Sequence, residues 1–279
     1  TAYNLRVSVS THIGKVRGNH EDNFYLEGLR LNEIFRNDFS ATYTISDADG
    51  MSFAVFDGMG GAAYGEIASE IAVQTMKKYE RRLKNAEGMR AVDQIVTEFV
   101  TEANNSICDM LREKNCLSGG TTFAMLYFID GLAKLYYLGD SRIYMQDEED
   151  LICLTRDHTL ANQKLDAGIY TEAQAKKSAD QHRLTLYVGV DKNGLGLNAD
   201  SRPPVALQPG RKFLLCTDGL VDMCSEQEIQ DILSQDYFNE AAVLVQTAVN
   251  YGGIDNVTCI VLEVIPIEEP AELESDPML

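Results

Sequence analysis

The chain has 279 residues, 45% of them hydrophobic, which is enough to bury a large core as a single domain. The formal net charge of −19 argues against nucleic acid or an anionic membrane as the main partner, because such surfaces require clustered Lys and Arg. The sequence contains no apolar stretch of transmembrane length and no recognisable signal peptide, so we expect no membrane insertion and a cytoplasmic location.

The chain opens with a strand signal. Leu5, Val7 and Val9 alternate with polar side chains, which is typical of a half-buried strand. Further along, residues 47–50 predict a turn between strands. This turn resembles the start of an EF-hand loop, but the third acidic ligand and the distal glutamate are missing.

Two long helices are predicted next. In the first, Ile67 and Ile71 share an apolar face with Ala68 and Ala72. In the second, apolar residues keep helical spacing over residues 92–111. We interpret both apolar stripes as faces packed on a core rather than as part of a cofactor site.

A strong hairpin signal follows the helices. Residues 123–129 and 132–138 predict two strands joined by a turn at Asp130-Gly131. Strands joined by hairpins imply an antiparallel sheet. Two long helices between blocks of strands favour an α+β sandwich over a parallel, doubly wound sheet.

Two segments depart from this pattern. Residues 157–202 are irregular, and an insert of this size in a compact domain is often a functional flap or lid. Residues 265–279 are acidic and contain several prolines, which predicts a disordered tail or linker after a domain of residues 1–264.

The six cysteines form no Cys-X-X-Cys pair, and several lie in apolar runs. We interpret them as buried thiols in a reducing compartment, in keeping with a cytoplasmic protein. They stand at Cys108, Cys116, Cys153, Cys216, Cys224 and Cys259.

Four short acidic segments, far apart in the chain, each place an aspartate where a strand or loop should end. Taken singly, each is explained as well by a turn residue or a helix cap. Three of them adjoin runs that favour buried strands, so their carboxylates would project from the rim of one core. Gathered carboxylates repel one another unless a cation lies between them, and oxygen-only ligands select Mg²⁺ or Mn²⁺ over zinc. The four are Asp22, Asp57, Asp218 and Asp255.

These segments belong to a longer series of short motifs. In order, the series reads Arg17-Gly18-Asn19-His20-Glu21-Asp22, Val55-Phe56-Asp57-Gly58-Met59-Gly60-Gly61, Gly119-Gly120-Thr121-Thr122, Gly139-Asp140-Ser141-Arg142, Leu154-Thr155-Arg156-Asp157-His158, Thr217-Asp218-Gly219-Leu220 and Asp255-Asn256-Val257-Thr258. Any one motif is weak, but the whole series in this order is highly specific. It resembles the motif series of the metal-dependent serine/threonine phosphatases of the PPM (protein phosphatase 2C) family, over residues 13–264. The Asp-Gly-Met-Gly-Gly form resembles bacterial members.

The resemblance implies a four-layer αββα sandwich of two antiparallel sheets, with a binuclear Mn²⁺ or Mg²⁺ site at one end. It implies hydrolysis of phosphoserine and phosphothreonine by direct attack of a water that bridges the two metals. By position, Asp57 would bridge both ions. Asp22 and the carbonyl of Gly58 would hold one ion, and Asp218 and Asp255 the other.

Further roles follow from the same resemblance. Arg17 would grip the substrate phosphate, and a planar guanidinium suits bidentate contact with phosphate. Glu21 would act through a metal-bound water. Asp140, together with Asp218, would hold a weaker third metal.

The sequence departs from the family at two places. Some members carry a histidine shortly after the Asp-Gly pair, proposed as the general acid, where this chain has Met59. A thioether cannot donate a proton, so the proton for the leaving group must come from elsewhere. Many bacterial relatives also carry Thr-Arg late in the flap, whereas residues 184–189 here read Leu-Thr-Leu-Tyr-Val-Gly.

The histidines are given structural interpretations. His158 is expected to pack behind the turn at Asp157, and His12, His20 and His182 show no metal-ligand spacing. Ser141 and Arg142 are expected to stabilise the turn after Asp140 rather than to touch substrate.

Other enzyme classes fit the sequence less well. Residues 58–63 loosely match a dinucleotide-binding fingerprint, but the following region stays helical where a second parallel strand should stand. None of the six cysteines has the arginine at the spacing of a cysteine-based phosphatase. Asp57 lacks the second aspartate two places on that an aspartyl-phosphate enzyme needs.

The remaining alternative is a non-catalytic PPM-fold module with a binding or regulatory role. Degenerate relatives usually lose metal carboxylates, whereas all four are present here, so the enzyme is favoured. Its partners would be proteins phosphorylated on Ser or Thr, and a Ser/Thr kinase with its substrates. We expect a monomer that does not bind nucleic acid and does not insert into a membrane.

Overall fold

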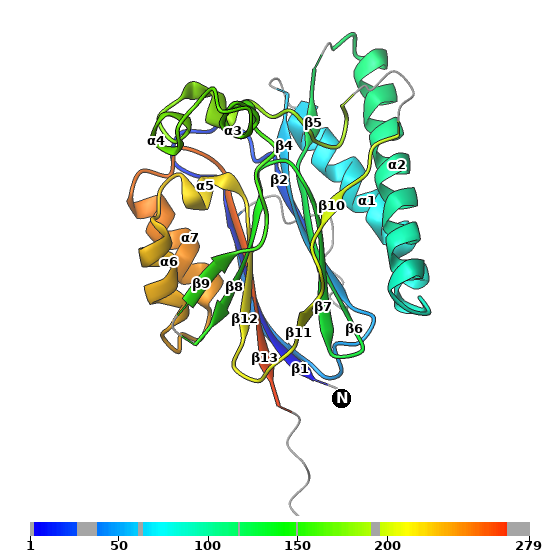
Figure 1. The fold of residues 1–279 in the computed structure, drawn as a ribbon, viewed down its shortest axis with the longest axis vertical. Coiled ribbons are helices and arrows are strands. Elements are labelled where there is room, and N and C mark those ends of the chain that lie inside the picture. Colours follow the sequence, from blue (N-terminus) through cyan, green and yellow to red (C-terminus); the bar gives the residue numbers. More distant parts are fainter. Residues whose placement is uncertain are drawn as a thin grey trace, which may run out of the picture.

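The computed structural model describes residues 3–26, 38–60, 64–116, 118–148, 150–190 and 196–266. Two antiparallel sheets pack face to face, and helices cover the outer face of each, which gives four layers (Figure 1). One hydrophobic core lies between the sheets, and another lies between each sheet and its helices. The predicted α+β sandwich of two antiparallel sheets is therefore confirmed.

The first sheet has the strand order β3-β1-β13-β12-β8-β9 and is covered by α5, α6 and α7. Its strands are β1 (Asn4–His12), β3 (Phe39–Ile45), β8 (Arg142–Asp147), β9 (Asp150–Cys153), β12 (Lys212–Cys216) and β13 (Val257–Ile265). The covering helices are α5 (Asp218–Val221), α6 (Glu226–Leu233) and α7 (Glu240–Asn250).

The second sheet has the order β10-β7-β6-β4-β2, with β11 paired to β7 and β5 paired to β4, and it is covered by two long helices. Its strands are β2 (Asp22–Leu26), β4 (Ser52–Met59), β5 (Gly120–Thr121), β6 (Phe123–Ile129), β7 (Leu132–Leu138), β10 (Asp200–Ser201) and β11 (Val205–Ala206). The helices are α1 (Tyr64–Lys84) and α2 (Met89–Glu113).

The predicted hairpin is present as β6 and β7, which pair from Phe123 opposite Leu138 to Ile129 opposite Leu132. Asp130 and Gly131 form its turn with φ values of 52° and 73°. Tight hairpin turns need positive φ at both central residues, which is why an Asp-Gly pair predicts one.

The expectation that β1 is half-buried is wrong. Ser8 and Ser10 are 1% and 5% exposed, as buried as the apolar residues on the opposite face of the strand. The cause is α7, which packs over that face; the backbone N–H of Ala241 donates to Ser8 Oγ over 3.4 Å. Small polar side chains let the helix approach the strand and still find hydrogen-bond partners.

Both long helices are confirmed, but the buried face of α1 differs from the expected one. Ala68 and Ala72 are fully buried, whereas Ile67 is 37% exposed. Alanine on the contact face lets α1 lie close to the sheet, and Ile67 then points away from that contact. The apolar spacing of α2 corresponds to its buried face as predicted.

The cysteines are only partly as expected. Cys108, Cys216, Cys224 and Cys259 are buried, and all six thiols are free. Cys153, however, is exposed, because β9 is an edge strand of its sheet.

The flap carries three short helices above one end of the sandwich: α3 (Leu160–Asp166), α4 (Glu172–Ala175) and the 3-10 helix Ala179–His182. An isolated bridge pairs Thr121 with Val188, which joins the flap to β5. Residues 267–279, most of the expected tail, lie outside the described residues, so the domain boundaries stay a prediction.

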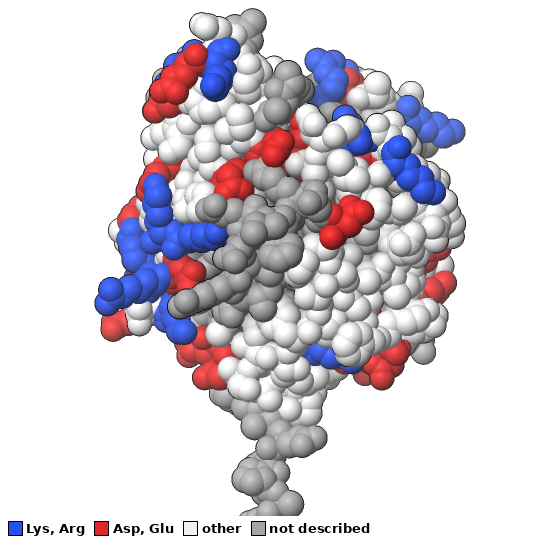
Figure 2. All heavy atoms as spheres, turned by 180° about the vertical axis from the view of Figure 1, so that it is seen from behind, with Lys and Arg blue, Asp and Glu red and all other residues white. Residues whose placement is uncertain are grey.

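Within the described residues, no helix is both long and apolar enough to cross a membrane. On the face seen in Figure 2, basic side chains are interspersed with acidic ones. Two of the basic residues of α1 are paired with α2, Lys78 with Glu102 and Arg82 with Glu98. The described part of this face therefore offers no uniformly basic surface of the kind that nucleic acid requires.

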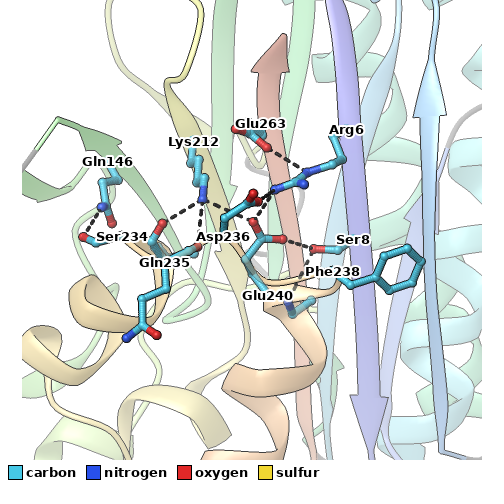
Figure 3. A network of polar contacts seen from close by, with 12 residues as sticks. Arg6, Ser8, Gln146, Lys212, Ser234, Gln235, Asp236, Phe238, Glu240 and Glu263 are labelled. Atoms are coloured by element: carbon cyan, nitrogen blue, oxygen red, sulfur yellow. Dashed lines mark hydrogen bonds and ion pairs between the residues drawn. The ribbon is translucent and has the colours of Figure 1, made fainter.

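A buried charge network fixes α7 to the first sheet (Figure 3). Glu240, at the first position of α7, is 2% exposed and accepts from Arg6 Nη2 over 2.8 Å and from Lys212 Nζ over 3.2 Å. Arg6 also contacts Glu263 on β13 over 2.8 Å. The network thus joins one helix to three neighbouring strands.

We expect Glu240→Ala to destabilise the fold by about 3 kcal/mol, because it leaves the largely buried Lys212 without a carboxylate and removes one partner of Arg6, which keeps Glu263. Asp236→Ala is the matched control: Asp236 also pairs with Arg6 but is 89% exposed, so its loss should cost less than about 1 kcal/mol. Urea unfolding measures both. Equal losses would mean that the buried carboxylate contributes no more than a surface ion pair.

Candidate metal centre and catalytic pocket

The starts of β2 and β13 and the ends of β4 and β12 meet at the end of the sandwich that carries the flap, around a pocket of about 600 Å³. Seven of the eight predicted site residues line it: Arg17, Glu21, Asp57, Gly58, Asp140, Asp218 and Asp255. The eighth, Asp22, is buried and stands opposite Asp57 in the pairing of β2 with β4. The structure therefore brings together the carboxylates that the sequence scatters.

Asp22 is held by two hydroxyl groups from the other sheet. Its Oδ2 accepts from Thr217 Oγ1 over 2.8 Å and from Thr258 Oγ1 over 2.7 Å. Its Oδ1 is buried without a hydrogen-bond partner. One oxygen of this carboxylate is thus fixed by protein donors, and the other is left available.

Glycines bring α1 close to the metal-facing end of β4. A Cβ on Gly58 would lie 2.1 Å from the carbonyl oxygen of Gly65. A Cβ on Gly65 would lie 2.5 Å from Glu21 Oε2. The Glu21 carboxyl therefore occupies space that only glycine leaves free, and burial raises its pKa.

Asp218 and Asp255 approach from the first sheet. Asp218 is the first residue of α5, directly after β12, and its Oδ1 is buried without a hydrogen-bond partner. Asp255 lies two residues before β13 and contacts Arg17, with Oδ2 and Nη2 2.5 Å apart. Arg17 remains 55% exposed and faces the pocket.

Asn256 joins the Arg17 loop to the rest of the site. Its Nδ2 donates to the carbonyl oxygens of Ile13, at 2.8 Å, and Asn19, at 3.0 Å. Its Oδ1 accepts from the backbone N–H of Glu21 at 2.7 Å. The sequence motif contains Asn256, but its clasping role becomes visible only in three dimensions.

The carboxylates strongly perturb one another. Burial first, and neighbouring carboxylates second, raise the pKa of Asp57 and of Asp140 well above the ordinary value. Burial and the charges of nearby carboxylates also raise the pKa of Asp218 to about 6. For Asp22, burial raises the pKa to about 8 even though two hydroxyl donors oppose the shift. Such a cluster is costly unless cations neutralise it.

The donor set fits hard divalent ions. The candidate side-chain ligands offer carboxylate oxygens, and two of these atoms, Asp22 Oδ1 and Asp218 Oδ1, are buried with no hydrogen-bond partner. Oxygen-only sites of this kind suit Mg²⁺ and Mn²⁺. The residues therefore fit the binuclear cofactor implied by the motif series.

Two pocket residues were not anticipated as site residues. Asp222 follows Asp218 by four positions, which places both on one side of the short α5 helix. His182 reaches the pocket from the flap, with Nδ1 3.8 Å from Asp222 Oδ2. Helical spacing from Asp218 could have identified Asp222. His182 lies 36 positions before Asp218, and no local sequence pattern connects residues so far apart.

His158 has the structural role expected of it. Its ring stacks on Tyr137 with centroids 5.2 Å apart, and its Nδ1 accepts from the backbone N–H of Gly139 over 3.0 Å. It does not line the catalytic pocket. Arg142 clamps Asp157 with Nε and Nη2, which supports the turn that carries Asp140.

The dinucleotide interpretation finds no support in the arrangement of elements. β4 leads into α1 and then α2, and the next strand pairs with β4 antiparallel. Residues 61–63 of the loose fingerprint lie outside the described residues. Met59 lines the catalytic pocket, as its place after Gly58 predicts.

Comparison with known proteins agrees with this geometry. The sequence model described as Protein phosphatase 2C matches residues 30–249, well over half of the chain. The chain therefore belongs to the protein phosphatase 2C family, and the expected class, a metal-dependent protein phosphatase, is confirmed. Arg17, Asp22 and Asp255 lie outside the matched range, so their roles rest on the geometry above.

Individual relatives are similar along nearly the whole chain. Protein phosphatase PhpP of Streptococcus pneumoniae is 28% identical over 272 residues, covering 96% of this chain and 100% of PhpP. Serine/threonine phosphatase stp of Listeria monocytogenes is 27% identical over 262 residues, covering 93% of this chain and 96% of stp.

Solved structures share the fold. The serine/threonine phosphatase of S. agalactiae superposes with a TM-score of 0.80 at 23% identity, over 93% of this chain and 99% of that one. The catalytic domain of the serine/threonine phosphatase PstP, solved with two manganese ions, gives a TM-score of 0.72 at 26% identity, over 94% and 99% of the two chains. Manganese or magnesium, the expected cofactor class, is thereby confirmed for the family.

Removing one carboxylate should affect the metal-free and the metal-loaded protein in opposite directions. In chelator at pH 7, we expect Asp218→Asn to raise the melting temperature by several degrees, because it relieves repulsion within the buried cluster. With Mn²⁺, the variant should lose most of the stabilisation that the ion gives the wild type.

Asp157→Asn is the matched control. Asp157 is also an acidic residue near Asp140, but Arg142 already neutralises it, so its replacement should lower the melting temperature in chelator. Differential scanning fluorimetry distinguishes the two variants. If Asp218→Asn destabilised the metal-free protein as Asp157→Asn does, repulsion would not govern this cluster.

Proposed function

We propose that this protein hydrolyses phosphoserine and phosphothreonine in phosphorylated proteins through a binuclear Mn²⁺ or Mg²⁺ centre. The observation that carries the proposal is the convergence of five aspartates on one pocket beside a half-exposed guanidinium. The family and the names of the relatives, serine/threonine phosphatases among them, support the substrate class.

In this proposal, Asp57 would serve both ions, Asp22 and the Gly58 carbonyl would hold one, and Asp218 and Asp255 would hold the other. When bound, two such ions lower the pKa of a bound water and screen the charge of the phosphate. The hydroxyls of Thr217 and Thr258 keep Asp22 oriented with its free oxygen available.

The remaining residues act on substrate and water. The five donors of Arg17 form a fork, so the side chain can keep its contact with Asp255 and also bind a phosphate oxygen. Glu21, which lies against Gly65 at the pocket wall, would orient a water molecule bound to one of the ions. Asp140, with Asp218, would hold a weaker third ion.

Nothing favours the alternative of a non-catalytic module. Such a module has no need to keep five mutually repelling carboxylates at one pocket, since each adds to the cost of the fold. The relatives that match along nearly the full chain are named phosphatases.

The wider setting is part of the same proposal. We infer an opposing Ser/Thr kinase, a monomeric state and a cytoplasmic location. Six free cysteines support a reducing compartment.

Hydrolysis of phosphopeptides with titrated Mn²⁺ and Mg²⁺ tests the activity. Phosphothreonine and phosphoserine peptides should be turned over with either ion and not in excess chelator. A strong preference for phosphotyrosine would overturn the serine/threonine assignment, and metal-independent turnover would overturn the binuclear centre.

Arg17→Ala should raise KM for a phosphothreonine peptide by on the order of tenfold, with a smaller change in the Mn²⁺ concentration that gives half-maximal rate. Arg17→Lys is the matched control, because it keeps the charge and loses the planar fork. Its KM should lie between the KM of the wild type and that of Arg17→Ala. An unchanged KM with weaker Mn²⁺ dependence would instead make Arg17 a support for Asp255.

Asp140→Ala should separate two leaving groups. Met59 cannot protonate the departing oxygen, so we assign that assistance to the Asp140 side of the pocket. Serine and threonine alkoxides need a proton, whereas p-nitrophenolate departs without one. At saturating Mn²⁺, Asp140→Ala should lower the turnover of both substrates. The loss for phosphothreonine peptides should be larger than the loss for p-nitrophenyl phosphate by a factor on the order of ten. Equal losses would mean that Asp140 only supports the binuclear centre.

A further inference from the structure

His182, Asp218 and Asp222 converge at the flap side of the pocket. Each offers one ligand atom, and these three atoms lie within 4.8 Å of one another. The imidazole belongs to the last residue of the flap's 3-10 helix, whereas the carboxylates come from α5 and its C-cap. Ligands about 2.1 Å from one ion lie roughly 3–4 Å apart, so small rotations of these side chains would let the three atoms share a cation.

The contacts within the cluster leave ligand positions open. Asp218 Oδ1 is buried with no hydrogen-bond partner. His182 Nδ1 and Asp222 Oδ2 are 3.8 Å apart, beyond hydrogen-bond length. A cation between the imidazole and the two carboxylates would bind lone pairs that accept no hydrogen bond within this cluster.

The second nitrogen of His182 already has a neighbour. Its Nε2 lies 2.9 Å from the side-chain amide of Gln181. The oxygen and nitrogen of an amide exchange places by rotation, so Gln181 can accept the Nε2 proton. That arrangement leaves Nδ1 unprotonated and turned to the carboxylates, as a metal-bound imidazole requires.

The flap holds His182 in place from both sides. Asp180, two residues earlier, is 8% exposed and accepts from Lys164 over 2.5 Å and from Tyr170 over 3.0 Å. On the other side, the carbonyl of Arg183 accepts from the backbone N–H of Leu160 over 2.8 Å. The ring is therefore carried by an ordered part of the flap.

We infer that His182 is a nitrogen ligand, supplied by the flap, of a divalent first-row transition ion that Asp218 and Asp222 also hold. The inference rests on the proposed function, because Asp218 belongs to both sites, and it goes beyond the third ion on Asp140 and Asp218. Imidazole suits ions such as Mn²⁺, whereas Mg²⁺ prefers oxygen ligands. An ion bound here would join the flap to α5.

Electron spin echo spectroscopy of Mn²⁺ tests the ligand directly. The full chain is given excess Mg²⁺ to fill sites made only of oxygen ligands, and Mn²⁺ at less than one ion per chain. In the wild type we expect the ¹⁴N modulation of a coordinated imidazole. It should disappear in His182→Gln, with Mn²⁺ affinity in the Mg²⁺ background falling on the order of tenfold or more.

His12→Gln is the matched control, because it removes an imidazole that contacts Asp38 instead; its nitrogen modulation should persist. Asp222→Asn should weaken Mn²⁺ binding. The Mn²⁺ that still binds this variant should keep its nitrogen modulation, because His182 is unchanged. Wild-type Mn²⁺ with oxygen ligands only would overturn the inference and leave His182 as an ion-pair partner or proton donor. Modulation that survives in His182→Gln would overturn it too.

The peptide assay separates this inference from the function on which it rests. If the wild type hydrolyses phosphothreonine peptides but shows no nitrogen signal, only the His182 ligand is wrong. If no phosphopeptide is hydrolysed with any metal, the proposed function fails, whatever the spectrum shows.

Discussion

Repulsion among buried carboxylates is the constraint on which the rest of this structure depends. Five aspartates line one pocket and Asp22 is buried beside them; burial, together with the charges of neighbouring carboxylates, raises the pKa of Asp22, Asp57, Asp140, Asp218 and Asp222. A metal-free fold can hold such groups together only if other contacts oppose their separation. Those contacts are the two sheets, whose strand ends fix the backbone beneath each carboxylate.

The sandwich is suited to this task because each sheet supplies part of the site. Asp22 and Asp57 face each other across one antiparallel pair, while Asp218 and Asp255 adjoin neighbouring strands of the other sheet. The bonds from Thr217 and Thr258 to Asp22 cross from one sheet to the other. Sliding of the sheets would break these bonds, so packing of the central core and geometry of the metal site depend on each other.

The sequence predicts the strand ends that carry the aspartates well, and it predicts the residues packed around them poorly, for a physical reason. Asp57 and Asp218 come soon after the apolar runs of β4 and β12, which are easy to recognise, and the turn at Asp130-Gly131 needs only local backbone chemistry. The full burial of Ser8 depends on a helix more than 200 residues away in the chain, which no local pattern of β1 contains.

The same distinction explains what was missed at the site. Asp222 has a local signal, its helical spacing from Asp218, while His182 and Asn256 act through contacts with distant segments. Exposed Ile67 shows the converse: a helical stripe identifies apolar residues, but the sheet that α1 approaches selects the small ones for the contact.

The flap is attached to the sandwich in a different way from the strands that carry the aspartates. The strands determine the positions of Asp57 and Asp218, whereas the flap is joined to the sandwich through backbone pairing of Val188 with Thr121. Backbone pairing places few demands on side chains, so residues such as Leu184 and His182, which both line the pocket, can change while the metal rim stays as it is. Substitutions in the flap can therefore change the lining of the pocket while the carboxylates that the sheets position stay where they are.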